Sequence, residues 1–144
     1  MAKPPVRRRP EKGHVLLIED DRILGEILQG FLQHNCGTTV HWAETAADAV
    51  NHLDKHGIGL IVSDVRFPSA AGKPPDSASG RLIAAHLELI RQKSGKKIPV
   101  VLHSTALDLA PDEIGKFVVH RVKKGAALQD LAALVNTHLG QKGK

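Results

Sequence analysis

Acidic, hydroxyl and basic residues follow directly after short apolar runs at four separate places in the chain. In order they are Glu19-Asp20-Asp21, Asp64, Ser104-Thr105 and Lys123-Lys124. If the apolar runs are parallel strands of one sheet, these polar groups converge outside the carboxyl ends of the strands, where ligands bind in such folds. One residue of this set has a simpler alternative, because Asp21 could cap a helix that starts at Arg22.

Converging carboxylates repel one another and bind hard divalent cations through oxygen. Without a cation, one of them would have its pKa raised. A Mg²⁺ ion held by carboxylates, water and phosphate oxygens suits this set, and a lysine and a hydroxyl opposite it would donate to phosphoryl oxygens. The pattern indicates phosphoryl transfer to or from a carboxylate, with Asp64 as the nucleophile.

The elements that must position these groups can be predicted from hydropathy. Apolar runs predict five strands, at residues 14–18, 38–42, 58–62, 98–103 and 118–122. Helical periodicity occupies the segments between them, with a short, weak helix at 111–115 and a last helix that ends at about Leu139. Strict alternation of this kind predicts an α/β fold: a doubly wound, five-stranded parallel sheet with helices on both faces.

Three local expectations follow for the segments around these strands. The first helix should bury one face made of two apolar columns, Ile23, Ile27 and Phe31 beside Leu24, Leu28 and Leu32. Thr45 can cap the second helix and Gly57 can end it. Residues 66–80 contain three prolines and two glycines, which predicts a long loop.

Composition limits the class of protein. The 144 residues are 42% hydrophobic and 24% charged, an ordinary globular balance. The net charge of +5 is concentrated at the ends, with +4 in residues 1–13 and +2 in residues 141–144. We therefore expect a disordered basic arm at 1–13, one domain at 14–140 with a net charge of −1, and a basic tail at 141–144.

The same composition excludes several classes of function. Three Phe, one Trp and no Tyr leave little for stacking on nucleic acid. The single Cys36 excludes an internal disulfide and a multi-cysteine zinc site. No apolar run is long enough for a membrane span or a secretory signal, so we expect a cytoplasmic protein.

The motifs resemble those of response-regulator receiver domains. The resemblance rests on residues 15–21 (VLLIEDD), 60–68 (LIVSDVRFP), 98–104 (IPVVLHS) and Lys124, and it covers about residues 13–140. It implies a flavodoxin-like sheet with strand order 2-1-3-4-5. It also implies a phosphoacceptor that assists its own phosphorylation and dephosphorylation, rather than an enzyme with turnover, and a histidine kinase or histidine phosphotransfer protein as its partner.

The resemblance assigns a role to each matching residue. Glu19 and Asp20 would hold Mg²⁺ (or Mn²⁺) with Asp64, which would accept the phosphoryl group. The backbone carbonyl of Arg66 would be a further metal ligand. The hydroxyl of Ser104 would move toward the phosphoryl group, and the ammonium of Lys124 would pair with the phosphoryl group.

Departures from the family pattern leave alternatives open. A shift of one position would make Thr105 or Lys123 the switch residue in place of Ser104 or Lys124. Gly125 stands where the family has a proline, and Arg121 stands where it has an aromatic residue. His103 or His120 could substitute for that aromatic, although packing is the simpler interpretation. The loop at 69–79 is longer than usual and could gate the site or contact a partner, with a tolerated insertion as the alternative.

We therefore expect a single-domain response regulator without a DNA-binding domain, whose output passes through a partner or by onward phosphotransfer. The competing hypothesis is a receiver-like adaptor that works without phosphorylation. A haloacid-dehalogenase-like phosphatase would need an aspartate at position 66, where Arg66 stands.

His52 and His56, four residues apart, could chelate a metal, but no third ligand lies nearby in the sequence, which favours a solvated pair.

Overall fold

The computed structural model describes residues 13–76, 78–105 and 110–139 of the chain. The main strands are β1 (His14–Ile18), β2 (Val40–Ala43), β3 (Ile58–Ser63), β6 (Val100–Ser104) and β7 (Val118–Lys123). The helices are α1 (Arg22–Cys36), α2 (Ala46–Lys55), α3 (Ser79–Ser94), α4 (Asp112–Gly115) and α5 (Leu128–His138). Compared with the expected strands, β2 and β6 each begin two residues later, and β2, β3, β6 and β7 each end one residue later.

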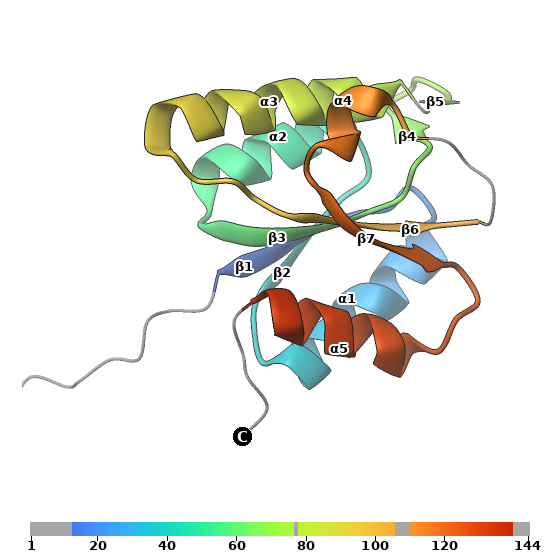
Figure 1. The fold of residues 1–144 in the computed structure, drawn as a ribbon. Helices are drawn as coiled ribbons and strands as arrows, with labels where there is room; N and C mark the ends of the chain where they lie inside the picture. Colours follow the sequence, from blue (N-terminus) through green and yellow to red (C-terminus); the bar gives the residue numbers. More distant parts are fainter. Residues whose placement is uncertain (1–12, 77, 106–109, 140–144) are drawn as a thin grey trace, which may run out of the picture.

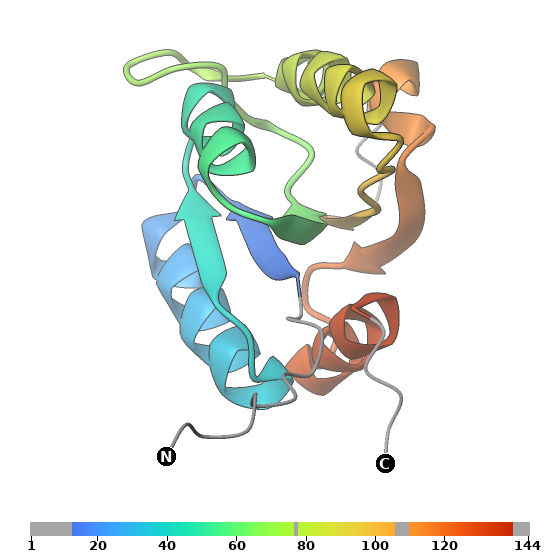
Figure 2. The same cartoon turned by 90° about the vertical axis from the view of Figure 1, so that its left-hand side faces the viewer.

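The five main strands form one parallel sheet in the order β2-β1-β3-β6-β7. Since β6 and β7 are the fourth and fifth strands of this sheet, the predicted order 2-1-3-4-5 is confirmed. The helices α2, α3 and α4 cover one face and α1 and α5 the other (Figures 1 and 2). The predicted doubly wound α/β fold is therefore confirmed.

Alternating side chains of β1 supply both halves of the core. Leu16 and Ile18 pack in the cluster beneath α2 and α3, whereas Val15 and Leu17 pack in the cluster beneath α1 and α5. All four are at most 1% exposed. Burial on both faces is the reason the strand reads as a continuous apolar run instead of an alternating one.

Helix α1 is capped at both ends but buries a narrower face than predicted. The carboxylate of Asp21 accepts a hydrogen bond from the Leu24 amide at 3.1 Å, and Gly37 ends the helix with a φ of 60°. The buried residues are Gly25, Leu28, Leu32 and Cys36. Ile23 and Ile27 are 76% and 51% exposed, so the predicted two-column face is wrong. The four buried residues, spaced three or four positions apart, form the stripe of α1 that packs against the sheet. Ile23 and Ile27 lie outside this stripe and face the solvent.

Thr45 caps α2 as predicted, its hydroxyl accepting a hydrogen bond from the Asp48 amide at 3.1 Å. The predicted loop at 66–80 is only partly irregular. Within it, β4 (Phe67–Pro68) and β5 (Pro75–Asp76) pair as a short antiparallel ladder, and Phe67 is buried. Burial of one aromatic ring anchors a segment whose prolines and glycines predict a loop. A role for residues 69–79 stays a prediction.

Helix α4 is a single turn of four residues, as short as the sequence predicts. No helix in the described ranges combines the length and the apolar character needed to cross a bilayer. The predicted basic arm and tail lie outside the described residues, apart from Gly13.

Candidate functional site

The carboxyl ends of β1 and β3 set two carboxylates side by side. These strands are neighbours in register, with Ile18 opposite Ser63. The residues that follow them are therefore adjacent, and the Asp64 amide donates to the Ile18 carbonyl at 2.8 Å. Glu19 and Asp64 are 1% and 8% exposed. The two acids thus lie at the edge of the core instead of on the open surface.

Asp20 completes a group of three carboxylates. One carboxylate oxygen from each of Glu19, Asp20 and Asp64 lies within 4.8 Å of the other two. The convergence expected from four separated motifs is therefore present for the acidic residues. A set of carboxylate oxygens is the donor type that Mg²⁺ and other hard cations prefer.

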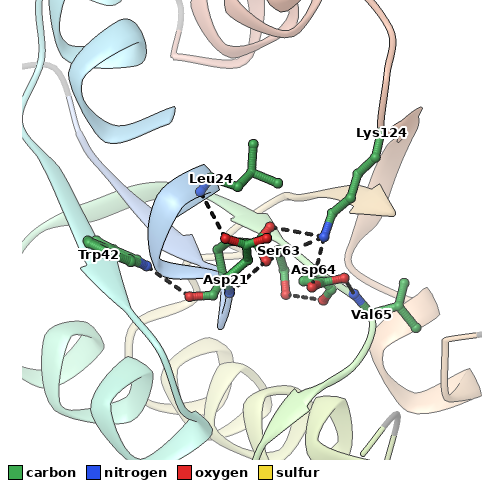
Figure 3. Close-up of polar contacts among 8 residues, drawn as sticks. Asp21, Leu24, Trp42, Ser63, Asp64, Val65 and Lys124 are labelled. Carbon is green, nitrogen blue, oxygen red and sulfur yellow. Dashed lines mark hydrogen bonds and ion pairs between the residues drawn. The ribbon is translucent and has the colours of Figure 1, made fainter. Parts of the chain in front are cut away.

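Lys124 approaches these acids from the end of β7 (Figure 3). Its ammonium nitrogen lies 3.0 Å from Asp64 Oδ2 and 3.1 Å from Glu19 Oε1. Burial disfavours the ammonium charge, but the hydrogen bond to Asp64 and the charge of Glu19 outweigh it and raise the pKa of Lys124. Lys123 is exposed. Of the two candidate lysines, Lys124 is the one that contacts the carboxylates.

One ammonium does not neutralise three carboxylates. Burial and the charge of Asp64 raise the pKa of Glu19 to about 7, and the same two causes raise the pKa of Asp20. This is the shift that the sequence predicts for converging acids without a cation. A divalent cation would supply the missing positive charge, so the residues present fit Mg²⁺.

The raised pKa of Glu19 gives a testable pH dependence. The unfolded chain releases this proton near pH 4.5 and the folded chain near 7, so the folded state holds more protons between these values. The contribution of Glu19 to the free energy of unfolding is therefore highest below pH 4.5 and falls as the pH rises through 7. Without divalent cations, we expect a loss on the order of 2 kcal/mol. Urea unfolding at pH 5 and pH 8 measures it.

Glu19→Gln is the matched control for this prediction, because its amide is neutral at every pH. The variant should lose less stability than the wild type between pH 5 and pH 8, and added Mg²⁺ should restore stability to the wild type at pH 8. Equal losses in the two proteins would contradict the assignment to Glu19.

For Ser104 and Arg66, no side-chain hydrogen bond or ion pair among the described residues connects the residue to the carboxylates. Ser104 is half-buried at the end of β6, and its carbonyl accepts a hydrogen bond from the Lys124 amide at 2.7 Å. The structure therefore links Ser104 to Lys124 through the backbone. Thr105 and Arg66 are exposed. The roles of the Ser104 hydroxyl, its alternative Thr105, and the Arg66 carbonyl stay predictions.

Hydrogen bonds from neighbouring residues, which the sequence analysis did not predict, hold Glu19 and Asp64 in place. The Trp42 indole nitrogen donates to the Glu19 carbonyl at 2.9 Å, and the Asp21 amide donates to Glu19 Oε2 at 3.2 Å (Figure 3). The Val65 amide donates to Asp64 Oδ1 at 2.8 Å. Trp42 lies one residue before the end of β2, and this position near the carboxyl end of a strand is the signal in the sequence that could have pointed to it.

The resemblance implies an aromatic switch residue at position 121, and this chain has Arg121 there. Arg121 is exposed on β7, whereas His103 is 4% exposed on β6. His103 Nδ1 has no hydrogen-bond partner among the described residues. Burial and the charge of Lys124 lower the pKa of His103, which favours the neutral form of this packed ring.

Comparison with solved structures gives the same fold. The receiver domain of response regulator 1452 from Francisella superposes with a TM-score of 0.65 at 19% identity, covering 90% of this chain and 98% of that one. A response regulator receiver protein from Pseudomonas putida gives a TM-score of 0.65 at 22% identity, covering 90% and 99%. Likeness at this level of identity establishes the architecture.

Sequence comparison extends this result to the family. The uncharacterized transcriptional regulatory protein YkoG of Bacillus subtilis (strain 168) is 27% identical over 138 residues, which are 92% of this chain and 54% of that protein. The chain thus spans about half the length of this curated relative. The family model described as the response regulator receiver domain matches residues 15–135. With the fold and this match together, the chain belongs to the response regulator receiver domain family of two-component signalling systems.

Proposed function

We propose that this chain is a Mg²⁺-dependent phosphoacceptor, phosphorylated on Asp64 by a histidine kinase or a histidine phosphotransfer protein. The observation that carries the proposal is the position of Asp64, whose carboxylate contacts the Lys124 ammonium and lies within 4.8 Å of a carboxylate oxygen of Glu19 and of Asp20. A carboxylate used only as a helix cap would need neither a half-buried lysine nor two further acids.

Phosphorylation would make one bond and break one. An oxygen of Asp64 attacks phosphorus, the bond from phosphorus to the donor's imidazole nitrogen breaks, and its electron pair stays on that nitrogen. Mg²⁺ bound by Glu19, Asp20 and Asp64, with the Arg66 carbonyl as a further ligand, would neutralise charge on the phosphoryl oxygens. The Val65 amide and Lys124 hold the attacking carboxylate from two sides before the reaction.

After transfer, the new charge on Asp64 would change the partners of its neighbours. Lys124 can move its contact from the carboxylate to a phosphoryl oxygen, and the Ser104 hydroxyl can donate to another. These contacts exist only in the phosphorylated form, so they would bias a two-state equilibrium. The output would pass to a protein partner or, by onward transfer, to a histidine. A cytoplasmic location stays a prediction.

Intact mass spectrometry tests the proposal. The chain is incubated with a small-molecule phosphodonor, with and without Mg²⁺, beside Asp64→Asn and the exposed control Asp130→Asn. We expect one phosphoryl increment that needs Mg²⁺, disappears in Asp64→Asn and persists in Asp130→Asn. An increment that survives in Asp64→Asn would reject Asp64 as the acceptor.

A second candidate function is a protein-binding adaptor that works without phosphorylation. It is favoured by the exposed Arg121 on β7 and by the single turn of α4, which depart from the pattern expected of a receiver that switches conventionally. Folded protein that gains no phosphoryl group under the conditions above would support this candidate in place of the first.

A further inference from the structure

Four histidines gather at the end of the sheet opposite to the acidic site. His14 begins β1, His41 lies in β2, and His52 and His56 lie at the end of α2. Because β1 and β2 pair in parallel and α2 packs over the same face, residues up to 42 positions apart in sequence meet there. Along β1, His14 stands roughly 16 Å from Glu19, so the two groups are separate.

The rings are close enough to act together. His14 Nδ1 lies 2.9 Å from His41 Nε2, a distance at which one imidazole shares a proton with the other. The rings of His41 and His56 stack with centroids 3.8 Å apart and planes at 13°. One ring nitrogen from each of His14, His41 and His56 lies within 4.8 Å of the other two.

We propose that His14, His41 and His56 form a binding site for a divalent transition-metal ion of the Zn²⁺ type. Zinc bonds to imidazole nitrogen at 2.0–2.1 Å, so nitrogens that share a tetrahedral zinc are roughly 3.3 Å apart. To bind one metal, the stacked rings of His41 and His56 must tilt so that their nitrogens aim at the same point. The proton between His14 and His41 must move to the other nitrogen of its own ring, which leaves both facing nitrogens free to bind the metal. Three imidazoles leave one coordination position for water.

The chemistry of the site favours a borderline metal over the cations of the acidic site. Imidazole nitrogen suits Zn²⁺, Cu²⁺ and Ni²⁺, whereas Mg²⁺ selects carboxylates and water. His14, His41 and His56 are each half-buried, so the ligands can be reached from solvent.

His52 is a neighbour of the site instead of a ligand. Its ring centroid lies 5.3 Å from that of His41 and 5.6 Å from that of His56, and it is absent from the three-residue cluster. The pairing of His52 with His56 expected from their spacing is thus present. His56 is the ligand of this pair, and the two other ligands come from β1 and β2, in His14 and His41.

Calorimetric titration of the full chain with Zn²⁺ tests the proposal. Excess Mg²⁺ in the buffer keeps zinc from the acidic cluster. We expect one zinc per chain, with the affinity reduced at least about tenfold in His14→Gln and in His56→Gln. The exposed His34→Gln in α1 is the matched control and should bind as the wild type does. Asp64→Asn should also bind normally, which separates this site from the proposed phosphoacceptor.

A second measurement avoids any dependence on the folding of the variants. In the wild type, zinc should shift the imidazole NMR signals of His14, His41 and His56 and leave the His34 signal in place. The proposal is overturned if zinc does not bind, if His14→Gln and His56→Gln, shown to be folded by circular dichroism, bind it as the wild type does, or if binding is lost in Asp64→Asn. Unshifted signals of the three histidines would overturn it as well.

Discussion

Replacing Lys124 with glutamine is expected to slow phosphorylation of Asp64 by about 10²–10³-fold, the usual loss when one preorganised group that stabilises transition-state charge is removed. The ammonium lies 3.0 Å from Asp64 Oδ2 and is largely buried, so glutamine cannot replace its charge at that place. The measurement is the rate of the phosphoryl mass increment with a small-molecule donor and saturating Mg²⁺. This prediction rests on the proposed function.

Mg²⁺ affinity separates a loss of chemistry from a loss of structure. Lys124 competes with any cation for Glu19 and Asp64, so Lys124→Gln should bind Mg²⁺ more tightly while it reacts more slowly. Lys123→Gln is the matched control, because Lys123 is the exposed residue directly before Lys124, at the end of β7. A normal rate in Lys124→Gln with a slow rate in Lys123→Gln would reverse the assignment of the two lysines.

The second large effect concerns two glycines of α1 that differ in their surroundings. A Cβ added at Gly25 would lie 2.3 Å from the Trp42 ring, whereas nothing lies within 4 Å of one added at Gly30. Gly25→Ala should therefore destabilise the fold by about 1–3 kcal/mol through overpacking. Gly30→Ala should stabilise it by up to about 1 kcal/mol, because alanine favours the helix.

Urea unfolding followed by the fluorescence of Trp42, the single tryptophan of the chain, measures both variants. The Gly25→Ala change also reaches the site. A displaced Trp42 ring would lose its hydrogen bond to the Glu19 carbonyl, so the variant should bind Mg²⁺ more weakly. Equal stabilities of the two alanine variants would show that Trp42 moves aside without strain.

The acidic part of the candidate site could be predicted because each acid stands next to an apolar run that can be recognised in the sequence. Glu19, Asp20 and Asp64 each follow a buried parallel strand, and the ends of such strands meet at one edge. Lys124 was harder to select over Lys123, since the exact residue at which β7 ends decides which side chain turns inward. Strand ends read from hydropathy are uncertain by at least that one position.

Contacts between distant segments account for what the sequence did not reveal. The orientation of α1 depends on which apolar column meets the sheet, and two adjacent columns gave no means of choosing between Ile23 and Leu28. The histidine cluster depends on the pairing of β1 with β2, which brings His14 to His41 across 27 positions. The ladder of β4 with β5 depends on burial of Phe67, a tertiary contact that local composition does not indicate.

The strand order gives the candidate site two parts of unequal stiffness. Its carboxylates follow β1 and β3, which have a partner strand on both sides, whereas Lys124 follows β7 at the edge of the sheet. Backbone amides of central strands exchange with solvent only in rare, extensive openings, and edge strands open more readily. Amide exchange should therefore be slow at Leu17 and Val62 and faster along β7. If the charge at Asp64 changes, we therefore expect β7 to move, while the carboxylates of Glu19 and Asp64 keep their positions.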